Sequence, residues 1–523
     1  MSHQIPALIQ SLQNPILFAH KVEYFKLIET HISWVLLTGR YAYKIKKPVN
    51  LGFLDFSSLD KRWHFCHEEL RLNGRLAKDI YLDVVAIIGT KETPEINGSG
   101  VAIEYAVKMR QFDPAKTFDQ LLKNNQLTRQ YIRQTAKIIS AFHGNIDKAA
   151  DDTEFGRAAS VMLPVQENFK QILQLNSIEK PDVLDYLLDW IEQQQCALQP
   201  VFNQRKRDGF IRLCHGDLHL ANIALIDQQI VPFDGIEFNP SLYWIDVISD
   251  IAFLVMDLQH KQRPDLAFQF VNDYLQQTGD YGGLKLLPFY LHYRAMVRAK
   301  VSAITATQKP DSKEGRLALA DYHGYLKLAF QYTRSTSPFM IIMQGVSGSG
   351  KSWLSEQIIE YFPAIRIRSD IERKRLYSSS TEQKNDVDIN NGLYSRQTSL
   401  QTYQRLQQLA TEIINAGYSV IVDATFLQRQ MRQQFFQLAE QLVIPFRIVH
   451  THTDKQTLLN RVKNRAGQEG NVSDADQQVL QQQLSNSEAL TRDELDYTIE
   501  IETTGEADLS PLWKKLKSLP DSP

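Results

Sequence analysis

The sequence predicts two domains of different class: an α+β domain over residues 1–334 and an α/β domain with a mainly parallel sheet over residues 335–523. Three observations support this. The chain has 523 residues, more than one ordinary hydrophobic core needs. Its N-terminal third alternates strand-like and helix-like patterns, and a glycine-rich loop in the C-terminal part lies between an apolar strand and a helix. A polar link ending in proline, at residues 334–338, indicates the boundary.

The composition is that of a globular protein without a strong charge of either sign. Hydrophobic residues make up 43% of the chain, charged residues 23%, and the formal net charge is -2, so no global basic field attracts nucleic acid. Cys66, Cys196 and Cys214 are too far apart to suggest a disulfide framework or a cysteine-rich metal site. Neither a secretory signal nor a membrane-spanning apolar run is present. We therefore expect a cytoplasmic protein without a membrane partner, and its oligomeric state stays open.

Residues 33–49 are predicted to form a β-hairpin with a dense basic cluster. Lys44 and Lys46 are two positions apart, so on a strand they point to the same face. A hairpin lysine can contact nucleotide phosphates if a carboxylate orients it. The alternative is a solvated basic strand.

The helix predicted over residues 59–76 supplies such a carboxylate. Glu68 and Glu69 lie in its middle, and further strands follow it. A lysine hairpin, a glutamate helix and additional strands together resemble the small lobe of a kinase fold. We assign Lys44 and Glu69 as the ATP-orienting pair, with Lys46 and Glu68 as substitutes.

A polar loop at residues 215–222, His-Gly-Asp-Leu-His-Leu-Ala-Asn, follows a short predicted strand. It resembles the catalytic loop H-G-D-x-x-x-x-N of the aminoglycoside phosphotransferase and choline kinase group, which has a bilobal, protein-kinase-like α+β fold. The resemblance implies that Asp217 orients the attacking hydroxyl and accepts its proton, and that Asn222 coordinates Mg²⁺. It also implies that Asp234, at the end of the next apolar strand, binds the metal. The alternative is a polar turn between two strands.

Two further aspartates belong to this resemblance. Asp246 and Asp250 lie where the family has its D-x-A region. We interpret both as structural groups that support the catalytic-loop backbone.

The loop at residues 345–352 matches the pattern G-x-x-x-x-G-K-[ST]. Its glycines allow the backbone to wrap around an anion, so that successive N–H groups point at the α- and β-phosphates of a nucleotide. Lys351 is expected to reach the β- and γ-phosphates, and the Ser352 hydroxyl to hold Mg²⁺. The residues assigned to nucleotide binding are Gly345, Ser347, Gly348, Ser349, Gly350, Lys351 and Ser352.

Two acidic residues follow strands of the same predicted sheet. Asp370 follows a strand over residues 364–367 and opens a helix, where ligands bind in open α/β sheets; a helix N-cap is the alternative. Asp423 ends a strand that begins at residue 419, and we expect it to be the second Mg²⁺ partner. A strand-ending turn is the alternative there.

Arg461 and Arg465 are four residues apart on a predicted helix and therefore share a face. Such a pair can clamp a transferring phosphoryl group as part of a lid, with residues 466–473 as the hinge. Surface arginines are the alternative.

Residues 338–517 resemble the small P-loop kinases that include zeta toxin, chloramphenicol phosphotransferase and the kinase domain of phage polynucleotide kinase. The resemblance implies that Asp370 activates the acceptor hydroxyl. The whole chain resembles bacterial fusions of an aminoglycoside phosphotransferase-like domain with an AAA-type P-loop ATPase or kinase.

We therefore predict a bifunctional enzyme that transfers the γ-phosphoryl group of ATP to hydroxyl groups of small molecules, with a Mg²⁺-ATP site in each domain. One alternative is a nucleotide-binding regulatory protein with one non-catalytic half. Another is a C-terminal nucleic-acid 5′-hydroxyl kinase, suggested by basic residues near Asp370 and disfavoured by the near-neutral charge; these residues are Arg366, Arg368, Arg373, Lys374 and Arg375. The acceptors and the choice of ATP over GTP stay open.

Overall fold

The computed structural model describes residues 5–52, 54–379, 396–465, 477–505 and 507–518. The chain forms two compact units: Met1–Asp257 with Phe289–Ala329, and Leu258–Pro288 with Phe330–Pro523. Residues 258–288, which the expected boundary near residue 334 places in the first domain, thus group with the C-terminal unit. The predicted fold class is confirmed, because the first unit is α+β and the second has a parallel five-stranded sheet.

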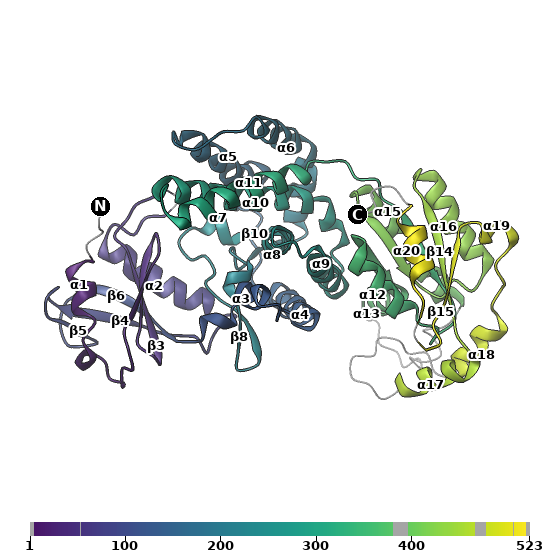
Figure 1. Ribbon diagram of the computed structural model, residues 1–523, viewed down its shortest axis with the longest axis horizontal. Coiled ribbons are helices and arrows are strands. Elements are labelled where there is room, and N and C mark those ends of the chain that lie inside the picture. The colour runs from purple at the N-terminus through teal and green to yellow at the C-terminus, as the bar shows by residue number, and fades with distance from the viewer. Residues whose placement is uncertain (1–4, 53, 380–395, 466–476, 506, 519–523) are drawn as a thin grey trace. The chain divides into compact units, whose positions relative to one another are not determined.

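The N-terminal part of the first unit is a six-stranded antiparallel sheet with strand order β1-β2-β3-β6-β4-β5 (Figure 1). Its strands are β1 (Lys26–Glu29), β2 (Ser33–Leu37), β3 (Tyr41–Lys46), β4 (Tyr81–Gly89), β5 (Pro94–Ile96) and β6 (Ala102–Arg110). The predicted hairpin is the β2–β3 pair. Its second strand ends at Lys46, two residues before Pro48, which has no N–H to continue the ladder.

A buried hydrophobic cluster lies on each face of this sheet. Neighbouring residues of a strand point to opposite faces, so each strand can contribute to both clusters. Leu37 belongs to a core cluster shared with Cys66 of helix α2 (Leu59–Asn73). Leu36 belongs to a second cluster with Ile9 of α1 (Ala7–Ser11). Helix α2 is therefore held against the sheet on the face opposite the N-terminal segment, which sets the position of Glu69.

The rest of the first unit is mainly helical and surrounds two short strand pairs. The helices include α3 (Phe118–Lys123), α4 (Arg129–Asn145), α5 (Ala158–Gln174), α6 (Val183–Arg207), α7 (Pro240–Tyr243), α8 (Val247–His260), α10 (Leu287–Gln308) and α11 (Lys313–Gln331). Strand β7 (Ile211–Leu213) pairs with β10 (Trp244–Asp246), and β8 (Ile223–Ile226) pairs with β9 (Gln229–Pro232). The His215–Asn222 loop joins β7 to β8 and ends in the 3₁₀ turn η3 (Leu220–Asn222).

The second unit is a parallel sheet with strand order β12-β13-β11-β14-β15. The strands are β11 (Met340–Gln344), β12 (Ala364–Arg368), β13 (Ser419–Asp423), β14 (Phe446–His452) and β15 (Thr498–Glu502). Strands β11 and β13 are buried along their whole length, as expected for a sheet with helices on both faces. The predicted strands near residues 364 and 419 are both present.

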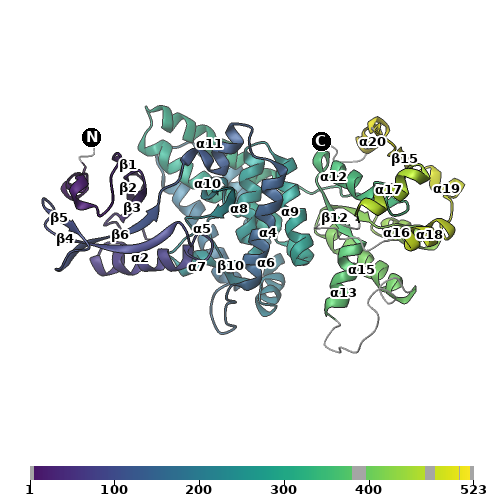
Figure 2. The ribbon, with the colours of Figure 1, turned by 90° about the horizontal axis from the view of Figure 1, so that it is seen from below.

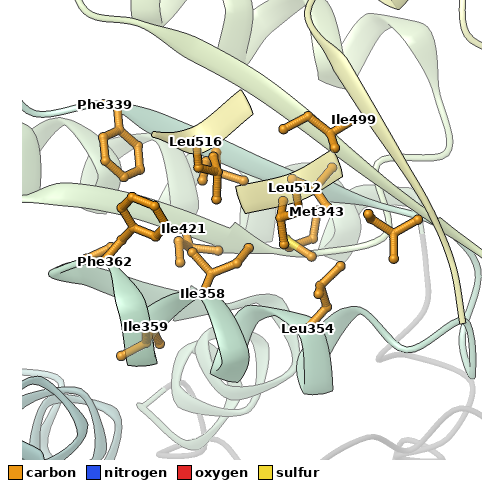
Figure 3. Packing of buried hydrophobic residues seen from close by; sticks show 14 residues of the cluster. Phe339, Met343, Leu354, Ile358, Ile359, Phe362, Ile421, Ile499, Leu512 and Leu516 are labelled. Carbon is orange, nitrogen blue, oxygen red and sulfur yellow. The ribbon is translucent and has the colours of Figure 1, made fainter. Parts of the chain in front are cut away.

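Helices cover both faces of this sheet. Figure 3 shows one face, where α12 (Lys351–Tyr361) and α20 (Ser510–Leu516) pack on strand residues such as Met343 and Ile421. Helices α15 (Arg396–Asn415) and α16 (Arg429–Gln441) contact strands β13 and β11. Figure 2 shows α13 (Ser369–Ser379) beside α15. The other elements are α9 (Pro264–Thr278), η4 (Tyr281–Lys285), α17 (Lys455–Arg465), α18 (Gln477–Ser485) and α19 (Arg492–Leu495).

Candidate active sites

Lys44 and Lys46 of β3 share one buried carboxylate, Glu69 of α2. Lys44 Nζ lies 2.8 Å from Glu69 Oε1, and Lys46 Nζ lies 2.7 Å from Glu69 Oε2. Burial by itself raises the pKa of Glu69, but the two ammonium groups outweigh it and lower that pKa to about 2. The neighbouring Glu68 instead pairs with Arg71 at the surface. Of the two glutamates, Glu69 is therefore the one that faces the lysines.

This ion pair has a testable effect on stability. A carboxylate whose pKa is depressed by folding contributes stability above its unfolded pKa of about 4.5, and loses it as the pH falls toward the folded value. We expect Glu69→Gln to lower the free energy of unfolding of the first unit by about 3–5 kcal/mol at pH 7. The difference from wild type should shrink below pH 4.5, as measured by urea unfolding at pH 7 and pH 4. Glu68→Gln is the matched control, with an expected loss under about 1 kcal/mol; equal losses in both variants would contradict the assignment.

The same cluster contains an acidic residue that sequence reasoning missed. Glu237 forms an ion pair with Lys46, whose side chain is 1% exposed. Glu237 lies three residues after Asp234, and its position near β3 depends on a contact across 191 positions of the chain. Each lysine is thus engaged by two carboxylates, and Lys44 is the more accessible of the two, since its side chain is 13% exposed.

Asp234 lies next to Lys44, with 2.6 Å between Oδ1 and Nζ. Its backbone is left-handed, at φ 58°, an uncommon conformation for a residue other than glycine. Two neighbours hold it there: the Asp234 N–H donates to Tyr81 Oη at 3.1 Å, and the Gly235 N–H donates to Asn73 Oδ1 at 2.6 Å. The Asp234 side chain is 45% exposed, so its carboxylate can reach a ligand.

Asn222 connects Asp217 to Asp234. Its Nδ2 donates to Asp217 Oδ2 at 2.9 Å, to the Asp217 carbonyl at 3.0 Å and to the Asp234 carbonyl at 3.4 Å. These three bonds use the amide nitrogen of Asn222, and the side chains of Asn222 and Asp234 also carry oxygen atoms that can act as metal ligands. Oxygen donors of this kind fit Mg²⁺, so these two residues could hold the ion.

His219 is a second residue that sequence reasoning left out, although it lies inside the recognised loop. Its Nε2 is 3.3 Å from Asp217 Oδ2. Burial lowers the pKa of His219, but the Asp217 carboxylate has the larger combined effect and raises it above its usual value. Burial likewise raises the pKa of Asp217, and His219 and its other cationic neighbours bring it well below the usual range. Asp217 is thus ionised throughout the neutral pH range.

Helix α8 holds the backbone of this loop. Asp250 accepts hydrogen bonds from the N–H groups of His215 at 3.1 Å and Gly216 at 2.8 Å. Asp257 accepts one from the Leu220 N–H at 3.0 Å. Asp250 therefore supports the loop as expected. Asp246 differs from the expectation, because it pairs with Arg205 and accepts from the N–H of Ile248 at the start of α8.

The glycine-rich loop of the second unit connects β11 to α12. Gly345 has φ 148°, and a Cβ there would lie 2.5 Å from the Thr451 carbonyl oxygen, so only glycine fits. The Ser349 hydroxyl is hydrogen-bonded to that of Thr451 at 2.7 Å. Lys351 Nζ donates to the Val346 carbonyl at 2.8 Å, within the loop itself. The Lys351 ammonium group is thus bound by a backbone carbonyl of the loop to which it belongs. Ser352 lies in the first turn of α12.

Asp423 lies at the same edge of the sheet as the start of this loop. The register pairs Met343 with Asp423, and the Gly345 N–H donates to the Thr425 carbonyl at 3.0 Å. Asp423 is 5% exposed, and its Oδ2 has no hydrogen-bond partner among the described residues. A buried carboxylate oxygen without a hydrogen-bond donor is costly; Arg368 Nε, at 3.7 Å, is too far away to donate, and a metal cation would satisfy the oxygen. Asp423 therefore fits the expectation of a Mg²⁺ ligand, and the shared site with Ser352 stays a prediction.

Asp370 lies in the first turn of α13, which begins at Ser369, so it is inside the helix and is not its N-cap. Its side chain is 28% exposed, and its Oδ1 is 3.6 Å from Arg373 Nη1. On the adjacent strand end, Arg368 Nε is 3.7 Å from Asp423 Oδ2. The two carboxylates thus each have an arginine nearby.

Arg461 contacts the phosphate loop itself. Its guanidinium donates to the Gly348 carbonyl at 3.2 Å, to Thr503 Oγ1 at 3.0 Å and to the Thr503 carbonyl at 2.6 Å. Thr503 Oγ1 in turn donates to the Ser349 carbonyl at 2.9 Å. In this structure Arg461 therefore braces the loop, and a role as a phosphoryl clamp stays a prediction. Arg465 is the last residue of α17; its side chain and residues 466–473 lie outside the described residues.

Comparisons with known proteins agree with this division. Residues 340–490 match the family model described as "AAA domain". Uncharacterized protein Rv2004c of Mycobacterium tuberculosis (strain ATCC 25618 / H37Rv) is 29% identical over 84% of this chain and 86% of its own length. Uncharacterized protein Mb2027c of Mycobacterium bovis (strain ATCC BAA-935 / AF2122/97) matches to the same extent.

Two solved kinase structures are each similar to a part of the chain. A choline kinase from Cryptosporidium parvum Iowa II is 14% identical, covering 62% of this chain and 94% of its own, with a TM-score of 0.38. A gluconokinase from Sinorhizobium meliloti 1021 is 22% identical, covering 33% of this chain and 86% of its own, with a TM-score of 0.23.

The parallel sheet, the phosphate loop and the AAA-domain match all lie in the second unit. Together they give that unit the fold and phosphate loop of a P-loop nucleotide-binding domain. Within the described residues, no helix is both long and apolar enough to cross a membrane.

Proposed function

We propose that the protein is a bifunctional phosphotransferase, with one Mg²⁺-ATP site in each unit, that phosphorylates hydroxyl groups of small molecules. The observation that carries this proposal is that the side chains assigned to catalysis and to nucleotide or metal binding lie close together within each unit. Asn222 joins Asp217 to Asp234 beside the Lys44–Glu69 pair in the first unit. In the second unit, the phosphate loop and the buried Asp423 lie at one edge of the sheet.

In the proposed reaction, the same bonds form and break in both units. The acceptor oxygen forms a bond to the γ-phosphorus of ATP, and the bond from that phosphorus to the bridging oxygen of ADP breaks. The hydroxyl proton passes to Asp217 in the first unit and to Asp370 in the second. Lys44 and Lys351 bind phosphate oxygens, and Asn222, Asp234, Ser352 and Asp423 hold Mg²⁺, which neutralises phosphate charge when bound.

A nucleic-acid acceptor for the second unit loses part of the support that the sequence suggested. Arg366 is 2% exposed and donates to the Ser352 carbonyl at 3.1 Å and to Ser355 Oγ at 3.0 Å. Arg375 pairs with Glu372 and donates to the Gln276 carbonyl. Two members of the basic cluster therefore make contacts within the protein, and a small-molecule acceptor is favoured.

The test is transfer of label from γ-labelled ATP, with Mg²⁺, to compounds of a fractionated small-molecule extract. We expect wild type to label at least two compounds, one lost in Asp217→Asn and another lost in Asp370→Asn. A single labelled compound that is lost in only one variant would leave one catalytic half and favour a regulatory role for the other. ATP binding without any transfer would overturn the proposal.

A further inference from the structure

Strand β12 is an edge strand of the parallel sheet, and the side chain of Asn272 from helix α9 caps its free edge. Asn272 Nδ2 donates to the Ala364 carbonyl at 2.9 Å, and Asn272 Oδ1 accepts from the Arg366 N–H at 2.7 Å. Residues two apart on a strand present these groups to the same edge, so one amide makes the two hydrogen bonds that another strand would make. Asn272 is 1% exposed, which makes both bonds costly to lose.

The end of α9 contacts the helix that carries Asp370. Arg375 of α13 donates to the Gln276 carbonyl at 2.7 Å and forms an ion pair with the buried Glu372 of its own helix. Gly279 ends α9 in a left-handed conformation, at φ 74°, and a Cβ there would lie 2.8 Å from Arg375 Nε. Only glycine therefore permits the guanidinium to lie at this position.

The same segment reaches the phosphate-loop side of the unit. Helix α9 packs against α12, the helix that follows the loop, as can be followed in Figure 1. Phe268 of α9 packs against the core cluster that α12 and the strands form. Arg366, whose N–H is bound by Asn272, donates through its side chain to the Ser352 carbonyl. Residues 258–288 thus contact α12, β12 and α13, the elements that carry Ser352 and Asp370.

We propose that the α9–η4 segment is a positioning element of the P-loop kinase, with Asn272 and Arg375 as its positioning residues. It holds the first half of β12 through Asn272 and the second half of α13 through Arg375, so that Asp370, which lies between these two contacts in the chain, has a defined place relative to the phosphate loop. The functional P-loop module therefore includes residues 258–288, although they precede the phosphate loop by more than fifty positions and are separated from it by chain of the first unit. The catalytic consequence rests on the function proposed above for Asp370, whereas the structural contact does not.

The test uses the full chain with Asp217→Asn in every protein, so that only the second unit can turn over. Asn272→Ala and Arg375→Gln are compared with Gln277→Ala, an exposed side chain on the same helix. Hydrogen exchange is measured over residues 364–377 and over β14 and β15, together with Mg²⁺-ATP affinity and the Asp370-dependent rate of label transfer. Arg375→Gln leaves the edge of β12 intact and serves as the second variant if Asn272→Ala fails to fold.

We expect exchange to rise by about tenfold or more over residues 364–368 in Asn272→Ala and over residues 369–377 in Arg375→Gln, since each variant loses hydrogen bonds to a buried partner. Exchange in β14 and β15 and the ATP affinity should stay within about twofold of Gln277→Ala. The transfer rate should fall by about tenfold with little change in the KM for ATP.

Three outcomes would overturn this proposal: exchange equal to that of Gln277→Ala, an equal rise in all five strands, or an unchanged transfer rate. If neither the wild-type chain nor the Asp217→Asn chain transfers phosphate, the proposed function fails. The exchange comparison then decides by itself whether α9 holds α13.

Discussion

Asp217→Asn is expected to slow phosphoryl transfer by the first unit about 10²–10⁴-fold, the usual loss when a general base is removed. The amide cannot take the hydroxyl proton, although its oxygen can still accept the hydrogen bond from Asn222 Nδ2. ATP affinity should change less than about twofold, because the Lys44–Glu69 pair and Asp234 are untouched. The rate of label transfer and the affinity for Mg²⁺-ATP are the two measurements.

The matched control for this variant is Asp227→Asn. Asp227 lies at the turn of the β8–β9 hairpin with a side chain that is 70% exposed, paired with Arg110 at the surface. The substitution has the same charge change in the same unit and should leave the rate within about twofold of wild type. A similar rate in both variants would exclude Asp217 as the base.

Lys351→Met is expected to reduce nucleotide binding from two sites per chain to one. In the structure the Lys351 ammonium donates to the Val346 carbonyl, and it is 8% exposed. A nucleotide would offer that ammonium charged phosphate oxygens, and losing hydrogen bonds to charged groups costs about 1.5–3 kcal/mol each. The P-loop site should therefore weaken by about a hundredfold or more.

Isothermal titration of the full chain with ATP and Mg²⁺ gives the number of sites directly. Lys455→Met is the control, because Lys455 is an exposed lysine at the start of α17. It should retain both sites. Two sites in Lys351→Met would show that the loop does not bind the nucleotide, and one site in wild type would contradict a nucleotide in each unit.

Several elements follow from local sequence because their signals are contiguous. The apolar run at residues 339–343 followed by the glycine-rich loop forms β11 and the turn into α12. The helix expected over residues 59–76 is α2, whose N-cap Ser58 accepts a hydrogen bond from the Lys61 N–H. Strand-ending Asp423 lies beside β11 because parallel neighbours end at the same edge of a sheet.

Other features could not be predicted, because their partners are distant in the sequence and of common residue types. The sequence paired Lys44 with Glu69, but it gave no sign that Glu69 also contacts Lys46 or that Glu237 joins the cluster. The paired arginines suggested a clamp, whereas Arg461 contacts Gly348 across 113 positions. Asp257 supports the catalytic loop from the far end of α8, and its place in an apolar stretch of that helix gives no signal of that role.

The sequence by itself determined the position of the phosphate loop and of the H-G-D-x-x-x-x-N loop, and the class of each fold. Both loops need a fixed local spacing of residues, which can be recognised in the sequence. Only the tertiary structure decided which side chains surround those loops and which segments belong to each unit. Helix α9 shows why. Its helical pattern fits either unit, and its place is set by the hydrogen bond from its residue Asn272 to the edge strand β12, 92 positions away. Contacts over such distances depend on the packing of whole elements, which local periodicity does not encode.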